Sequence, residues 1–386
     1  MGGAETLART TAEHLLQCGI EVEVLTTCSK QFLSDWTDFY EQGLYEINRV
    51  PVRRFRVDPR DTRLFDQINL KLMNSQSISL DEEYDFIENN INSKALCEYL
   101  SENRSKYIFF FIPYMFGTTY LGSQVCPERS FLIPCLHDES YAYLKIFKHM
   151  FENAGGLLFL SEPELELARR IFDLAGKTAA VVGVGIDTDV SFDAARFRRG
   201  FGVEDEFVLY VGRKDATKNT PLLIDLFCKY VELRDTQLKL VLNGQGSVSI
   251  PDRYRDRIID LEPRSGQDKL DAYSAALVTD QPSVHESFSI VIMESWVCGT
   301  PVLVHRDCNV TKYHCTKSNG GLCFREFDEF AGCLDFFVDN SHARRRMGEN
   351  GRGYVLANYA WQRVLDRYLQ LIPTSIDDLG GTDSDS

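Results

Sequence analysis

The sequence of 386 residues lacks the features that mark several protein classes. Its 11 cysteines form no C-x-x-C pair and no regular framework, which favours free thiols in a reducing compartment. Basic residues are few, since 42 Lys and Arg stand against 57 Asp and Glu, and the net charge of −15 argues against a general nucleic-acid binder. No secretory signal precedes the cysteines, and the best apolar run, 107–117, is too short to cross a bilayer. We therefore expect a cytoplasmic protein.

Strand-like and helix-like segments alternate along a chain that is 44% hydrophobic, as expected for a protein with a real core. Strands are predicted at 21–27, 107–114, 130–136, 156–161, 179–184, 207–213, 238–244, 258–263, 276–283, 301–305 and 321–324. Helices are predicted between most of them, for example at 5–17, 141–153 and 163–173. This alternation predicts an α/β fold with two doubly wound, Rossmann-like domains and one interdomain cleft.

The domain boundary is expected near 183–190, where Gly and Asp interrupt the apolar pattern. The predicted domains are 1–185 and 186–360. A last helix at 361–372 is expected to pack back on the first domain, and the acidic tail at 375–386 is expected to be disordered.

Two glutamates stand out in the segment 282–295, which we interpret as a turn and a helix after an apolar strand. Glu286 and Glu294 are eight positions apart, so on one helix they would lie two turns apart and close to one face. Glu286 would begin the turn, and the amides after it could point at an anion. The helix is apolar on most sides, which predicts burial, and buried carboxylates need partners. A solvated face is the alternative interpretation.

The segment 211–219 places Arg213 and Lys218 between a strand and a helix. Two cations at the carboxyl end of a strand suit a diphosphate and could stabilise a leaving group without a metal. A solvated basic loop is the alternative.

Weaker candidates lie in the first domain. His137 directly follows an apolar strand and could bind a sugar hydroxyl, or it could be a structural histidine. Gly2 and Gly3 open a helix, where the backbone could approach a phosphate closely.

Other motifs are discounted. The Asp187–Asp189 pair is interpreted as a turn in the linker, and 244–246 is too short for a dinucleotide fingerprint. The His and Cys residues in 305–315 do not have a standard zinc spacing. No metal and no bound cofactor are expected.

The order of these motifs resembles the retaining glycosyltransferases of family 4, which have the GT-B fold. The E-x7-E block formed by Glu286 and Glu294, together with the loop of Arg213 and Lys218, is the most specific part of this resemblance. It implies that Glu286 contacts the donor sugar, Glu294 the nucleotide ribose, and the two cations the diphosphate. It also implies that His137 lines the sugar site.

The resemblance further implies that Gly2 and Gly3 approach the donor phosphate or the acceptor. Donor contacts are expected along Ser287, Phe288, Ser289 and Ile290.

The chain departs from the family in two places. The family usually has Glu-Gly-Phe-Gly where this chain has Glu286-Ser287-Phe288-Ser289, which leaves the donor sugar open. The family also has an apolar strand before its first glycines, whereas this sequence starts at them. We therefore expect the first sheet to lack its central strand, and a helix to begin at the glycines.

The implied activity is metal-independent transfer of a hexose from a UDP- or GDP-sugar to a hydroxyl acceptor in polysaccharide or glycan synthesis. The implied partners are the nucleotide sugar and a glycan, lipid-linked or small-molecule acceptor. Peripheral membrane association and the oligomeric state are left open. The alternatives are a nucleotide-sugar-binding protein without turnover and a GT-B phosphorylase or epimerase.

Overall fold

The computed structural model describes residues 2–30, 36–262 and 265–371, so the acidic tail predicted at 375–386 lies outside the described residues. The chain divides into two compact units. Unit 1 is Met1–Gly185 together with the chain from Val364, and unit 2 is Ile186–Arg363. None of the helices within the described ranges is both long and apolar enough to cross a membrane.

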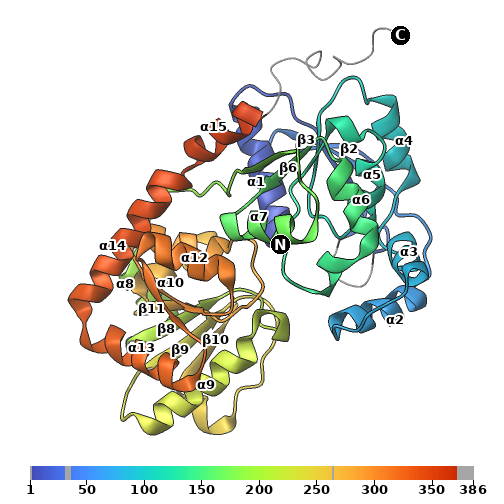
Figure 1. Ribbon diagram of the computed structural model, residues 1–386. Helices are drawn as coiled ribbons and strands as arrows, with labels where there is room; N and C mark the ends of the chain where they lie inside the picture. The colour runs from blue at the N-terminus through green and yellow to red at the C-terminus, as the bar shows by residue number, and fades with distance from the viewer. Residues whose placement is uncertain (1, 31–35, 263–264, 372–386) are drawn as a thin grey trace. The chain divides into compact units, whose positions relative to one another are not determined.

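Unit 2 contains one parallel sheet of six strands, in the order β10-β9-β8-β11-β12-β13 (Figure 1). The strands are β8 (Phe207–Val211), β9 (Lys239–Asn243), β10 (Ile258–Leu261), β11 (Val278–Gln281), β12 (Val302–His305) and β13 (Gly321–Phe324). The helices are α8 (Ala194–Phe201), α9 (Thr220–Leu233), α10 (Gly266–Ala275), α11 (Ile290–Val297), α12 (Asn309–Ser318), α13 (Phe327–Asp339) and α14 (Ser341–Asn358).

Two apolar clusters hold the helices on opposite faces of this sheet. One joins the sheet to α9 and α13, and the other joins it to α8 and α10. The strand order is that of a dinucleotide-binding sheet, in which the order reverses between β8 and β11. Ligands bind such sheets in the crevice outside the carboxyl ends of the strands at this reversal. The loops after β8 and β11 are therefore the places where a ligand site is expected in unit 2.

Unit 1 is built differently, because its seven strands form two separate sheets among the described residues. One sheet has the order β1-β3-β2 and the other β4-β5-β6-β7. The strands are β1 (Val24–Thr27), β2 (Gly43–Ile47), β3 (Val50–Phe55), β4 (Phe109–Phe111), β5 (Ser130–Leu132), β6 (Gly156–Phe159) and β7 (Thr178–Val181). The helices are α1 (Gly3–Gln17), α2 (Thr62–Met73), α3 (Leu80–Glu88), α4 (Lys94–Glu102), α5 (Gly117–Ser123), α6 (Lys145–Asn153) and α7 (Glu162–Ile171).

The interruption in the first sheet agrees with the sequence prediction. The helix at the glycines begins at Gly3, with Gly2 as its N-cap, and β1 and β4 are each an edge strand. The two edges share an apolar cluster beneath α4, and the carboxylate of Glu23 before β1 accepts hydrogen bonds from Tyr99 (2.7 Å) and Tyr107 (3.3 Å). Side-chain contacts therefore connect two sheets that, among the described residues, no backbone hydrogen bonds join.

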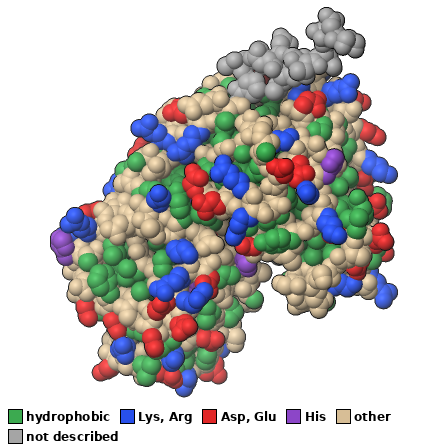
Figure 2. Space-filling view, viewed as in Figure 1, with side chains coloured by type: hydrophobic (Ala, Val, Ile, Leu, Met, Phe, Trp, Pro, Cys, Tyr) green, Lys and Arg blue, Asp and Glu red, His purple; other side chains and the backbone are tan. Residues whose placement is uncertain are grey.

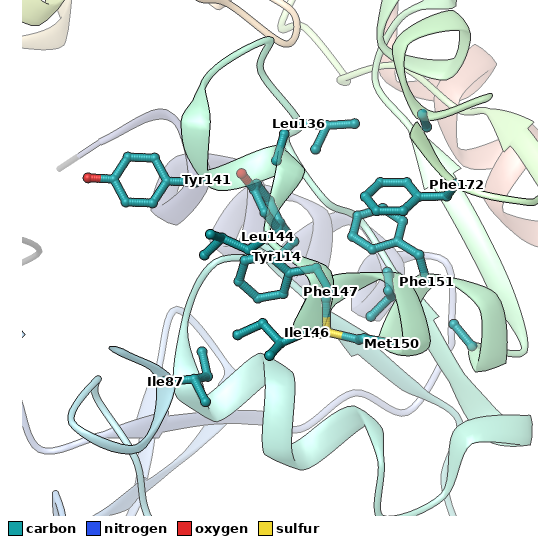
Figure 3. Close-up of a cluster of buried hydrophobic side chains, with 14 of the residues drawn as sticks. Ile87, Tyr114, Leu136, Tyr141, Leu144, Ile146, Phe147, Met150, Phe151 and Phe172 are labelled. Carbon is teal, nitrogen blue, oxygen red and sulfur yellow. The ribbon is translucent and has the colours of Figure 1, made fainter. Parts of the chain in front are cut away.

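The main core of unit 1 lies around α6 (Figure 3). Phe151 stacks on Phe172 with ring centroids 4.0 Å apart, and Tyr114 meets Phe147 edge to face at 5.0 Å. Leu136 lies in the same core. The residue before His137 is therefore fixed by packing, which limits where the histidine can go.

The last helix, α15 (Trp361–Leu371), crosses the boundary between the units. Within unit 1, the guanidinium of Arg367 donates to the carbonyl of Val182 over 3.0 Å, and the ring of Tyr368 contacts Phe110. The C-terminal part of α15 is thus anchored on the first unit by a ring on β4 and by the residue that follows β7.

Candidate functional site

Glu286 lies in the loop after β11 and forms an ion pair with the lysine of the loop after β8. Lys218 Nζ is 2.7 Å from Glu286 Oε1, and the side chains are 26% and 10% exposed. Asn219, next to this lysine, donates to the carbonyl of Pro282 over 3.1 Å and so ties the two loops together. The pair therefore sits at the carboxyl edge of the sheet, at the reversal of strand order.

Arg213 belongs to the same β8 loop and turns toward its own neighbours. Its guanidinium is 3.6 Å from Asp215 and donates to the Thr217 hydroxyl over 3.4 Å, and its side chain is 40% exposed. The Tyr210 hydroxyl donates to the carbonyl of Arg213. Burial is the main cause that raises the pKa of Tyr210, with further contributions from Glu286 and Asp215. One phenol thus lies near the parts of the site that contain Arg213 and Glu286.

Glu286 lies before the helix, as expected of a residue that begins the turn, so the two glutamates do not lie on one helix. The helix α11 begins at Ile290, so Glu286 lies in the preceding loop and only Glu294 is helical. The reason is Ser289, the N-cap, whose φ of 70° is left-handed and turns the chain into the helix. This conformation costs a non-glycine residue on the order of 1 kcal/mol.

The expectation that buried carboxylates have partners is confirmed at Glu294, 19% exposed. It accepts from Lys269 Nζ at 2.6 Å and from the Tyr273 hydroxyl at 3.0 Å. Burial, followed by the charge of Glu294, raises the pKa of Tyr273 well above its ordinary value, so the phenol stays a donor. Sequence reasoning missed both partners, although their spacing of four on α10 places them on one helix face.

The remaining predicted residues of this loop have distinct surroundings. Phe288 is buried, with its ring 5.3 Å from the His314 ring and 4.9 Å from that of Tyr359. Ser287 and Ile290 are partly exposed, at the amide end of α11. Burial lowers the pKa of His314 to about 3, so this histidine is a neutral packing partner.

In unit 1, His137 lies in the segment after β5, next to the buried Leu136. Its Nδ1 is 3.4 Å from the Glu139 carboxylate, and its side chain is 29% exposed. Glu164, on α7, accepts from the amides of Leu136 and Leu160, each over 2.6 Å. Glu164 therefore pins the residue next to His137, a role that sequence reasoning missed.

Gly2 caps α1, and Gly3 is its first residue. A Cβ atom on Gly2 would lie 2.5 Å from Oε2 of Glu5, while Gly3 has open space around it. The convergence of Gly2, Gly3 and His137 with the unit 2 residues on one cleft stays a prediction.

The motifs that the sequence analysis discounts do not form a metal site in the part of the chain that the structure describes. Within residues 2–30, 36–262 and 265–371, no three His, Cys, Asp or Glu side chains are arranged to hold a metal ion. His305 packs its ring on Phe324, and His314 Nδ1 is 3.0 Å from the Tyr354 hydroxyl. Acidic and basic side chains are interspersed on the visible face (Figure 2).

Comparisons with known proteins relate the second unit to glycosyltransferase sequences. Residues 191–354, within unit 2, match the family model described as Glycosyl transferases group 1. The D-inositol 3-phosphate glycosyltransferase of Corynebacterium efficiens is 27% identical over 236 residues, which cover 55% of this chain and 55% of the relative. That of Acidothermus cellulolyticus is 32% identical over 48% of this chain and 43% of its own length. The chain thus spans about half the length of these curated relatives.

Solved structures show the fold. Sucrose-phosphate synthase from Thermosynechococcus elongatus has a TM-score of 0.68 at 18% identity, over 97% of this chain and 94% of its own. HepE of Anabaena, solved with UDP and glucose, has a TM-score of 0.61 at 15% identity, over 85% of this chain and 87% of its own. The predicted fold is confirmed: the protein has the GT-B fold of two Rossmann-like domains.

Proposed function

We propose that the protein is a metal-independent retaining glycosyltransferase that moves a hexose from a nucleotide diphosphate sugar to a hydroxyl acceptor. The observation that carries the proposal is the pairing of Lys218 with Glu286 at the reversal of strand order in unit 2. The match of residues 191–354 to a glycosyltransferase family and the fold shared with HepE, solved with UDP and glucose, support it.

In this proposal Lys218 and Arg213 neutralise the diphosphate as the bond to the sugar breaks. Fixed cations act where negative charge develops, so they lower the barrier more than they strengthen ground-state binding. The free amides at the start of α11 add donors for the same phosphates. Glu286 would accept a hydrogen bond from a sugar hydroxyl. Before the donor binds, the ion pair with Lys218 would stabilise the negative charge of Glu286.

Retention of configuration requires attack on the face from which the diphosphate leaves. We propose that the donor phosphate itself takes the acceptor proton, and that Glu286 orients the sugar rather than attacking it. Glu294 would accept hydrogen bonds from the ribose, with Lys269 and Tyr273 fixing its carboxylate. His137, Gly2 and Gly3 would serve the sugar and acceptor side from unit 1.

The test is a transfer assay with a panel of UDP- and GDP-sugars, with and without glycan and small hydroxyl acceptors, in buffer containing EDTA. We expect slow donor hydrolysis alone and faster, acceptor-dependent transfer, with the anomeric configuration retained by NMR. Loss of activity in chelator that manganese restores would contradict metal independence and direct attention to Asp187 and Asp189.

A binding protein without turnover is the second candidate, because the first sheet is split at the position where a doubly wound sheet would be continuous. Thermal-shift measurements separate the two, since a ligand that binds the folded state raises its stability. Binding of a nucleotide sugar with neither hydrolysis nor transfer would favour the second candidate. In a separate reaction with inorganic phosphate, release of a sugar phosphate would show phosphorolysis. Formation of an epimerised donor would show that the protein is an epimerase.

A further inference from the structure

A buried lysine lies in the middle of the loop that carries Arg213 and Lys218. Lys214 is the third residue after β8, and its side chain is 1% exposed, whereas that of Arg213 is 40% exposed. A lysine is almost never fully buried unless its charge has a partner. Here the ammonium lies 2.5 Å from the Asp260 carboxylate and donates to the carbonyl of Leu261 over 3.4 Å. Lys214 therefore turns inward from a loop whose other two cations are partly exposed.

The ion pair of Lys214 crosses the end of one strand to reach the next. In the sheet order β10-β9-β8, Lys214 follows β8, whereas Asp260 and Leu261 are the last two residues of β10 (Figure 1). The stem of the lysine therefore passes the carboxyl end of β9, at the edge of the sheet where the diphosphate site is proposed. This side chain fastens the β8 loop to a strand that lies two places away in the described sheet.

The Gly-Gln-Gly segment after β9 gives the β8 loop room to lie against it. A Cβ atom on Gly244 would lie 1.8 Å from the carbonyl oxygen of Gly212, and one on Gly246 would lie 2.9 Å from that of Lys214. The amide of Lys214 donates to the carbonyl of Gln245 over 2.8 Å. The two glycines thus allow a close approach of the loops that larger residues would prevent.

We propose that Lys214 is a positioning residue of the diphosphate site in unit 2. The proposal rests on the proposed function, because it assigns to Lys214 the task of holding Arg213 and Lys218 in place before the donor binds. Cations that are already in place avoid the cost of ordering a loop on binding and stabilise charge where it develops. Lys214 acts through the loop and not on the phosphates, since its ammonium is bound by Asp260 and the Leu261 carbonyl.

A variant of the partner, Asp260, separates a positioning role from an electrostatic one. If Lys214 acted through its charge, Asp260→Asn would remove the neutralising carboxylate and strengthen the binding of a diphosphate. A lysine that positions the loop predicts the reverse, because the weaker anchor lets the loop move. The Asp260 side chain is 34% exposed, so Asp260→Glu has room to keep the ion pair and should bind as the wild type does. Stronger binding in Asp260→Asn would overturn the positioning role.

The first experiment compares UDP with uridine in the wild type and in Lys214→Met, by calorimetry for UDP and by NMR for uridine. Methionine keeps an apolar stem of similar length and removes the anchor. We expect the dissociation constant of UDP to rise about tenfold and that of uridine to stay within about twofold, because only the phosphates meet the displaced cations. GDP and guanosine replace these probes if the wild type binds GDP instead. Equal rises for both ligands, or an unchanged constant for UDP, would overturn the proposal.

Lys239→Met is the matched control. Lys239 begins β9 at the amino edge of the same sheet, and its ammonium is 3.1 Å from the Asp205 carboxylate. The variant loses an ion pair of unit 2 at the edge opposite the β8 loop, so we expect wild-type dissociation constants for both ligands. A loss of UDP binding equal to that of Lys214→Met would contradict a role particular to Lys214.

Hydrogen exchange measures the anchor without a ligand. In Lys214→Met, the amides of residues 212–219 should exchange about tenfold faster than in the wild type, while those of β11 should exchange at the same rate. Unchanged exchange in the loop would overturn the proposal. If the wild type bound neither UDP nor GDP, the proposed function would fail and the diphosphate role with it, whereas the exchange rates would still decide whether Lys214 holds the loop.

Discussion

In unit 2 the candidate residues form ion pairs across loops and helices, whereas in unit 1 a buried carboxylate fixes the backbone next to His137. Lys218 pairs with Glu286, and Lys269 pairs with Glu294, across loops and helices that parallel strands bring together. In unit 1 the supporting carboxylate, Glu164, accepts hydrogen bonds from backbone amides, among them those of Leu136 and Leu160. The charged side chains of unit 2 are therefore expected to act in ligand binding, whereas the buried acid of unit 1 fixes the conformation of a loop.

The difference predicts different consequences of mutation. Removing a charge from the unit 2 network should change ligand binding more than folding, because those side chains are partly exposed. Removing the unit 1 carboxylate should change folding first, because it leaves buried amides without an acceptor.

The largest expected effect is on the stability of unit 1. Glu164→Ala leaves the amides of Leu136 and Leu160 unpaired, at about 1–3 kcal/mol each, so we expect a loss of about 3 kcal/mol or more in unfolding free energy. Urea denaturation measures it. Glu166→Ala, an exposed position on the same helix, is the matched control and should change stability by less than about 0.5 kcal/mol. Equal losses would show that Glu164 does not support the loop.

Glu164 should also make the free energy of unfolding depend on pH. Burial raises the pKa of Glu164 from 4.5 to about 8, although three backbone hydrogen bonds oppose it. Between these values the native state keeps a proton that the unfolded state has lost, so this group's contribution to stability falls as pH rises. Glu164→Gln should be less stable than wild type at pH 5 and should lack this fall. A parallel pH profile in both proteins would contradict the raised pKa.

Next in size is the loss of nucleotide binding in unit 2. Lys218→Ala should weaken binding of the nucleotide diphosphate about 10–100-fold, in line with the ~1.5–3 kcal/mol of a charge-assisted contact. Arg213→Ala should have a smaller effect, because its side chain is more exposed and turns toward Asp215. Calorimetry measures the affinity, with Lys229→Ala on α9 as the control. Unchanged binding and turnover in both site variants would rule out the diphosphate role.

A smaller effect is expected at the second ion pair. Lys269→Met keeps the apolar stem but leaves Glu294 with Tyr273 as its remaining partner, so we expect about fivefold weaker binding of UDP, ~1 kcal/mol. The loss should be smaller for a UDP analogue without ribose hydroxyls. An equal loss for both ligands would show that Lys269 acts on the phosphates instead.

The smallest expected effect is a gain in stability on mutation, and it concerns a second buried acid that can be compared with Glu164. Asp280 on β11 is fully buried like Glu164, but neither of its oxygens has a hydrogen-bond partner among the described residues, and burial raises its pKa well above 3.8. The native state then keeps a proton at neutral pH that the unfolded state loses, which costs stability as pH rises. Asp280→Asn should therefore stabilise the protein by about 1 kcal/mol or more at pH 7 and by little at pH 4. A destabilised variant at pH 7 would show that the carboxyl has an ionised role.

Much of the fold could be predicted from the sequence, because buried parallel strands are short apolar runs. All six strands of unit 2 lie within or against segments predicted from such runs, as do β4 to β7 of unit 1. The β2–β3 hairpin was missed because β2 is an exposed edge strand with little apolar alternation. Its turn at Asn48 and Arg49 has φ of 52° and 68°, the conformation that Asn-Gly normally signals.

The candidate site could be predicted only in part. Glu286, Arg213 and Lys218 are charged residues at the ends of predicted strands, so they can be recognised from the sequence pattern. The structure places the three in neighbouring loops of one unit. Glu164 could not be found this way, because its partners are backbone amides, which every residue except proline has. Lys269 was not predicted as a site residue either, because a lysine on a helix is usually solvated. Only the tertiary fold brings it to Glu294.

The split sheet of unit 1 has a consequence for how that unit opens. Backbone hydrogen bonds run unbroken across all six strands of unit 2, so amides there should exchange with solvent largely through one cooperative opening. In the described part of unit 1 the β1-β3-β2 sheet and the β4-β5-β6-β7 sheet share only side-chain contacts, so each can lose its amide protection alone. Native-state exchange should then resolve two opening free energies in unit 1, with the three-stranded sheet the lower because its edge strand β2 is mostly exposed to water.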